Sequence, residues 1–67
     1  MKSFGENLRY FRQLAKISQA NLGVMLGFSA RTVSDWECNN TEPNIATIKK
    51  LIKILDISFD ELFDYDD

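Results

Sequence analysis

The stretch SQANLGVMLGFSARTVSDWE, residues 18–37, decides the fold of this chain. It contains two short runs with apolar residues at helical spacing, and each run follows a serine that can cap a helix, Ser18 or Ser29. Gly27 lies between the runs, where a helix can end in the left-handed conformation that glycine adopts at little cost. The stretch therefore predicts two short helices joined by a tight turn.

The rest of the chain also has a helical pattern. The segments SFGE (residues 3–6) and SFDE (residues 58–61) are capping boxes, with a serine at the cap and a glutamate three residues later. Asn44 caps a further helix after the loop NNTEPN (residues 39–44), whose proline stops any helix there. No segment alternates as a strand does, so we predict an all-α fold of five short helices. The apolar stripes expected in its outer helices are Phe4, Leu8, Phe11 and Ala15 in the first, Ile45, Ile48, Ile52 and Leu55 in the fourth, and Leu62 and Phe63 in the fifth.

The second run of the opening stretch has two different faces. Val33, Trp36 and Glu37 share the side that must point to the core. The residues expected on the outward side are Arg31, Ser34, Asp35 and Cys38, with Ala30 and Thr32 beside them. Two short helices of which the second is displayed make a helix-turn-helix, and the major groove of DNA, about 12 Å wide, admits one α-helix. Gly23 in the first helix is either a point where the two helices cross closely or a tolerated weak spot, since a mid-helix glycine costs about 1 kcal/mol.

Glu37 needs a partner because an unpaired carboxylate on the inward side of a helix is costly. Arg12 lies on the inward side of the first helix. We therefore predict a charge-assisted pair between Arg12 and Glu37 that links the first and third helices. This pair is structural rather than catalytic.

The charge of the chain is unevenly distributed. All eight basic side chains lie in residues 1–55 with only four of the ten acids, and the other six acids lie in residues 56–67. We divide the chain into a domain over residues 1–63 and a short acidic tail over residues 64–67. The tail is either a solubilising end, or an interaction segment, or a patch that repels DNA from the wrong face.

Composition excludes several classes of protein. The chain has no histidine, and its single cysteine, Cys38, has no evident base nearby, so we expect no enzyme, metal or cofactor. One cysteine allows no internal disulfide, which fits a reducing cytoplasm. No apolar run approaches the roughly 18 residues of a membrane span, and the N-terminus lacks the apolar stretch of a signal peptide. We predict a cytoplasmic protein with no membrane and no small-molecule substrate.

The opening stretch resembles the helix-turn-helix family of Cro and the phage repressors, also called the xenobiotic-response-element family. The resemblance covers nearly the whole chain, from Phe4 to Phe63, and includes the ending EPNIATIKKLIKILDISFDELF (residues 42–63). The matching positions of the motif are Ser18, Gln19, Leu22, Leu26, Gly27, Phe28, Ser29, Thr32, Val33, Ser34, Trp36 and Glu37. The chain departs from the family at Gly23, which is usually alanine, and in WECNN (residues 36–40), which replaces the usual W-E-N-G. The resemblance implies a compact five-helix domain similar to that of lambda repressor.

The resemblance also implies a DNA-binding site. Gln19 would contact a phosphate and brace the start of the third helix, and Ser29 and Thr32 would contact phosphates or nearby base edges. Ala30, Arg31 and Asp35 would face the bases, where arginine suits guanine and aspartate can accept from cytosine; the alternative for Arg31 and Asp35 is a mere exposed ion pair. The complete set of expected DNA-binding residues is Ser18, Gln19, Ser29, Ala30, Arg31, Thr32, Ser34, Asp35, Asn39, Asn40 and Asn44. The three asparagines are either phosphate donors or simple turn formers.

The function expected from the sequence is that of a transcriptional regulator, of the repressor type, that binds double-stranded DNA as a homodimer on a palindromic operator. Phe59, Phe63 and Tyr65 are a possible dimer patch, although Leu62 and Phe63 could instead close the core. Regulation would be simple, through concentration, dimerisation or a protein antagonist. The alternative is a protein-interaction module on the same fold, such as an antitoxin that binds a partner protein and its own promoter.

Overall fold

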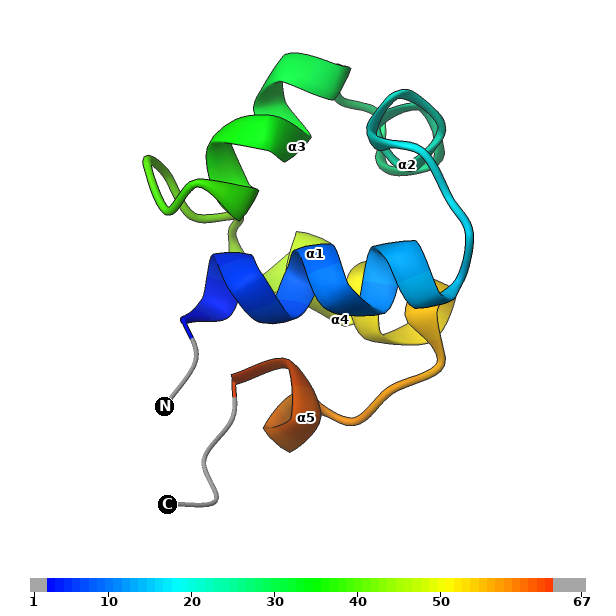
Figure 1. Ribbon diagram of the computed structural model, residues 1–67, viewed down its shortest axis with the longest axis vertical. Helices are drawn as coiled ribbons and strands as arrows, with labels where there is room; N and C mark the ends of the chain where they lie inside the picture. Colours follow the sequence, from blue (N-terminus) through cyan, green and yellow to red (C-terminus); the bar gives the residue numbers. More distant parts are fainter. Residues whose placement is uncertain (1–2, 64–67) are drawn as a thin grey trace.

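The computed structural model describes residues 3–63, which form the five predicted helices. Their bounds are α1 Phe4–Leu14, α2 Gln19–Leu26, α3 Ala30–Glu37, α4 Ile45–Leu55 and α5 Phe59–Phe63. Figure 1 shows α1 running between the α2–α3 pair on one side and α5 on the other. α1 packs against both α3 and α5, and α2 packs against α3. α1 is therefore the central element on which α3 rests.

Each of the first four helices begins at the predicted cap. The Ser3 hydroxyl accepts a hydrogen bond from the Glu6 amide while the Glu6 carboxylate accepts one from the Ser3 amide, which completes the capping box. The other caps are Ser18, Ser29 and Asn44, whose side-chain oxygens accept from the amides three residues on. The box at residues 58–61 is also formed, with reciprocal bonds between Ser58 and Glu61.

The turn between α2 and α3 depends on two glycines. Gly27 ends α2 in the left-handed region with φ 82°, as the sequence predicts. A Cβ on Gly23 would lie 2.9 Å from the carbonyl carbon of Ser29, so the backbones of α2 and the turn touch there. Of the two readings of Gly23, the structure supports close crossing.

The core joins apolar side chains from all five helices. Its fully or nearly buried members are Leu8, Leu22, Leu26, Val33, Trp36, Ile48, Leu51, Leu55 and Leu62. Two expected core positions are wrong. Ile45 is 60% exposed, although Thr47 and Ile48 in the same first turn of α4 are buried, and Ala15, the C-cap residue of α1, is exposed. Leu51 takes the central position on α4 instead.

Candidate nucleic-acid interface

α3 is anchored on one side and open on the other. Val33 and Trp36 are buried, and the Trp36 ring meets the edge of the Phe28 ring at a centroid distance of 5.2 Å. On the opposite side, Arg31 is exposed, while Ser34 and Asp35 are half-buried. Cys38, expected within the helix, is its exposed C-cap. The open face of α3 therefore carries one long cationic side chain, that of Arg31, among shorter polar side chains.

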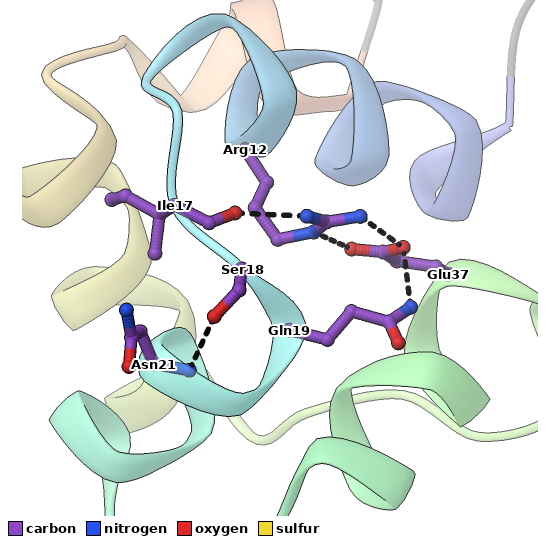
Figure 2. A network of polar contacts seen from close by, with 6 residues as sticks. All are labelled: Arg12, Ile17, Ser18, Gln19, Asn21 and Glu37. Atoms are coloured by element: carbon purple, nitrogen blue, oxygen red, sulfur yellow. Dashed lines mark hydrogen bonds and ion pairs between the residues drawn. The ribbon is translucent and has the colours of Figure 1, made fainter.

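The carboxylate of Glu37 is the centre of the polar network that holds α3. It accepts from Nε and Nη2 of Arg12 at 2.5 and 3.2 Å, and Nη1 of Arg12 donates to the carbonyl of Ile17 at 2.8 Å. The two side chains are only 10% and 4% exposed, so the predicted pair is present and buried. Figure 2 shows the guanidinium lying between the Ile17 carbonyl and the Glu37 carboxylate. The network therefore joins α1, the α1–α2 loop and the last residue of α3.

Gln19 belongs to the same network. Its Nε2 donates to Oε1 of Glu37 at 3.0 Å, the same oxygen that accepts from Nη2 of Arg12 (Figure 2). The expectation that Gln19 braces the start of α3 is therefore wrong, because its contact is with the end of that helix. This tie fixes the first turn of α2 relative to the end of α3.

Arg31 and Asp35 lie one helical turn apart on the open face of α3. The Nε of Arg31 is 3.6 Å from Oδ1 of Asp35, and the Arg31 side chain is 86% exposed. An exposed pair of this kind contributes about 0.3–0.5 kcal/mol. So weak a contact leaves Arg31 able to turn toward another acceptor at little cost.

Four of the predicted contact residues at the helix starts are engaged in local bonds. Ser18, Ser29 and Asn44 cap α2, α3 and α4, and the hydroxyls of Ser29 and Thr32 lie 3.1 Å apart. Ala30 is half-buried in the first turn of α3. The caps satisfy one first-turn amide in each of these helices, and the other amides of a helix start favour an anion.

The three loop asparagines differ in their contacts. Asn39 has φ 61°, and its side chain contacts the first turn of α1 through Ser3 and Gly5. Asn40 is exposed, and its backbone amide donates to the carbonyl of Asp35. The contacts of Asn39 bridge 34 and 36 positions in the chain, and sequence reasoning missed them, as it missed the bond from buried Asn7 to the carbonyl of Leu62.

The candidate dimer patch is partly used inside the domain. Leu62 is fully buried, and Phe63 is half-buried between Phe4 and Phe59, at ring-centroid distances of 5.1 and 4.6 Å. Phe59 is 41% exposed. Tyr65 lies outside the described residues. Leu62 therefore closes the core, and Phe59 gives this end of the domain an exposed aromatic surface.

Comparison with known proteins identifies the arrangement. A profile of helix-turn-helix proteins matches residues 8–62. The chain belongs to the helix-turn-helix family. Repressor protein C2 of Salmonella phage P22 is 45% identical to this family member over 58 residues, which are 87% of the chain and 27% of the repressor. The uncharacterised HTH-type transcriptional regulator YqaE of Bacillus subtilis is 34% identical over 59 residues, which are 88% of the chain and 51% of YqaE. The chain thus spans between a quarter and a half of the length of these relatives.

The family fold is matched in detail by a solved structure. The crystal structure of the P22 c2 repressor protein in complex with a synthetic operator superposes with a TM-score of 0.88 and 41% sequence identity. The match covers 98% of this chain and all of the repressor chain in that structure. The expected five-helix domain of the repressor type is therefore confirmed.

Two features of the described residues concern other kinds of site. No helix within residues 3–63 is both long and apolar enough to cross a membrane. Among these same residues, no three His, Cys, Asp or Glu side chains gather as metal ligands would.

Proposed function

We propose that this protein is a transcriptional repressor that recognises a specific sequence in double-stranded DNA by placing α3 in the major groove. The observation that carries the proposal is the likeness, over 98% of the chain, to a repressor solved on its operator. The geometry of α3 supports it, because the helix is anchored by Val33, Trp36 and Glu37 and leaves its other face accessible. A helix held in this way can enter a groove without losing core contacts.

The open face of α3 supplies the base contacts in this proposal. Arg31 turns from Asp35 to bind a guanine through two hydrogen bonds, and Asp35 accepts from the amino group of a cytosine. Each contact of this kind is worth about 1–3 kcal/mol of discrimination. This exceeds the about 0.3–0.5 kcal/mol of the exposed ion pair that it replaces. The small side chains of Ala30 and Ser34 let the helix approach the base edges closely.

The phosphate contacts come from helix starts and the loop before α4. Ser18 and Gln19 at the start of α2, Ser29 and Thr32 at the start of α3, and Asn40 and Asn44 before α4 are the proposed phosphate-binding residues. Backbone amides at these positions strengthen phosphate binding, because the positive end of a helix favours phosphate. Such contacts fix the orientation of the protein without reading sequence.

A homodimer on a palindromic operator completes the proposal. Two recognition helices about 34 Å apart read successive major grooves on one side of DNA. The aromatic surface formed by Phe59 and Phe63 is the proposed contact between the two copies. Sedimentation with and without operator tests this part, and a monomer under both conditions contradicts it. We also propose that the protein acts in the cytoplasm of a bacterial or phage-infected cell, where it would meet DNA.

The decisive experiment is selection of binding sites from a random pool of duplex oligonucleotides. Wild-type protein is compared with Arg31→Ala and with Lys53→Ala, which removes the same charge from the last turn of α4. We expect Arg31→Ala to lose preference at one base position, and Lys53→Ala to keep every preference. The affinity of the wild type for the selected site should fall with salt, with a slope of about −0.9 per phosphate neutralised. Absence of any selected sequence, together with binding that ignores salt, refutes the proposal and favours the protein-interaction alternative.

A further inference from the structure

Asn39 occupies an unusual position just after the end of α3. It follows the C-cap residue Cys38 and has φ 61°, in the left-handed region where asparagine is one of the few tolerated residues after glycine. Its backbone amide donates to the carbonyl of Trp36 at 3.1 Å. The chain therefore turns away from α3 at this residue, and the turn directs the Asn39 side chain toward the start of α1.

The side chain of Asn39 binds the first turn of α1 with both ends of its amide. Oδ1 accepts from the backbone amide of Gly5 at 3.0 Å, and Nδ2 donates to the Ser3 hydroxyl at 2.9 Å. The Gly5 amide lies in the first turn of a helix, where no carbonyl of the same helix can accept from it. Asn39 thus supplies a partner that α1 cannot provide for itself.

Gly5 shows how closely the two helices meet. A Cβ on Gly5 would lie 2.4 Å from the carbonyl oxygen of Glu37 and 2.7 Å from that of Trp36. The positive end of α1 therefore faces the carbonyls at the negative end of α3 directly, which is a favourable arrangement of the two helix dipoles. The amide of Asn39 fastens this contact from one side.

We propose that Asn39 is a positioning residue that fixes the angle of α3, and hence its orientation in the major groove. The inference rests on the proposed function. α1 holds the end of α3 at two points, Arg12 with Glu37 and the first turn with Asn39. Gly5 and Arg12 are seven residues apart, or about 10 Å along a helix that rises about 1.5 Å per residue. Val33 and Trp36 anchor α3 in the core, and two polar attachments at this separation add to that anchoring by setting the direction of α3 on α1.

A competing role for Asn39 is that of a phosphate donor, which the sequence suggested. Two substitutions separate the roles. Asn39→Gly keeps the left-handed backbone but removes the side-chain amide. The fold is therefore retained without the two hydrogen bonds to Gly5 and Ser3. Asn39→Asp keeps an oxygen for the Gly5 amide, and the Ser3 hydroxyl can donate to it. It also places a negative charge where a helix start favours one but a phosphate does not.

The test measures amide exchange, operator affinity and base selection for both variants, with Thr41→Asp as the matched control. Thr41 is exposed in the same loop, and its substitution adds the same charge without touching the hydrogen bonds of Asn39. Circular dichroism melts first establish that every variant is folded at the assay temperature.

If Asn39 positions α3, Asn39→Gly speeds exchange of the Gly5 amide by about tenfold, the factor for one lost hydrogen bond of about 1.4 kcal/mol. It also reduces the ratio of affinity for the selected site to that for random DNA, by on the order of threefold. Asn39→Asp stays closer to wild type than Asn39→Gly in both measurements. If Asn39 is a phosphate donor, Asn39→Asp binds all DNA more weakly than Asn39→Gly does, and the affinity ratio is unchanged in both. That result overturns the inference.

The two levels of proposal fail in different ways. If the wild type selects no sequence, the proposed function fails, and the positioning role fails with it. If the wild type selects a sequence and Asn39→Gly selects it equally well, only the positioning role is overturned.

Discussion

Removal of the Glu37 carboxylate is expected to cost most of the stability of the domain. Glu37 accepts three hydrogen bonds, two from Arg12 and one from Gln19. Without it, the guanidinium keeps its bond to the Ile17 carbonyl but becomes a buried charge with no counter-charge. Breaking a buried pair from one side costs about 3–5 kcal/mol. The core of a domain this small supplies a similar amount, about 3–5 kcal/mol.

A double-mutant cycle measures how much of this loss belongs to the pair. Arg12→Met, Glu37→Met and the double variant are unfolded in urea, followed by circular dichroism, in a constant concentration of an osmolyte that keeps the single variants folded. Each single variant leaves one charge buried alone, whereas the double variant leaves none. We therefore expect the double variant to be more stable than either single variant, with a coupling free energy above about 2 kcal/mol.

Gln19→Ala is the control in this experiment. It removes one half-buried hydrogen bond and no charge, so its cost should be about 1 kcal/mol. If the two methionine substitutions add within about 0.5 kcal/mol, the pair has no coupling and the reasoning is refuted.

Four other sites give expected outcomes, each measured by thermal unfolding followed by circular dichroism. Gly23→Ala should lower the melting temperature. A Cβ 2.9 Å from the Ser29 carbonyl carbon costs about 1–3 kcal/mol, whereas the higher helix propensity of alanine returns only about 1 kcal/mol. An unchanged or higher melting temperature contradicts the close crossing. Gly27→Ala should cost about 1–2 kcal/mol through its φ of 82° alone, since nothing lies within 4 Å of the added carbon; a neutral result would show that the turn relaxes. Leu62→Ala should cost about 2–5 kcal/mol as a fully buried truncation. Phe59→Ala should cost only about 0.5–1.5 kcal/mol, for one stacked aromatic pair, and equal losses at Leu62 and Phe59 would contradict the division between core and surface.

The helix boundaries could be predicted from the sequence because caps are local interactions. Ser18 and Ser29 each accept from an amide three residues away, so the residues that define the cap are adjacent in the sequence. The role of Gly27 was also predictable, because a positive φ at the end of a helix is a local requirement that glycine meets at little cost. Arg12 and Glu37 are 25 residues apart, but burial of two opposite charges left few other partners.

Contacts between neutral polar groups were not predictable in this way. Asn39 carries no charge that demands a particular partner, and the Gly5 amide it binds belongs to a helix end 34 residues away. Gln19 has many possible acceptors, and only the packing of α2 on α3 brings its amide to Glu37. Ile45 follows the apolar period of α4, but periodicity does not reveal that its side chain is 60% exposed while Ile48 in the same turn is buried.

The placement of Trp36 makes α3 its own spectroscopic reporter. Trp36 is the single tryptophan of the chain, it is 3% exposed, and it lies on α3 in edge contact with Phe28. Indole fluorescence shifts to longer wavelength when water reaches the ring, so emission excited beyond the absorption of tyrosine comes from this one helix. Loosening of α3, unfolding and docking of a ligand on its open face can therefore be followed in real time without any attached dye.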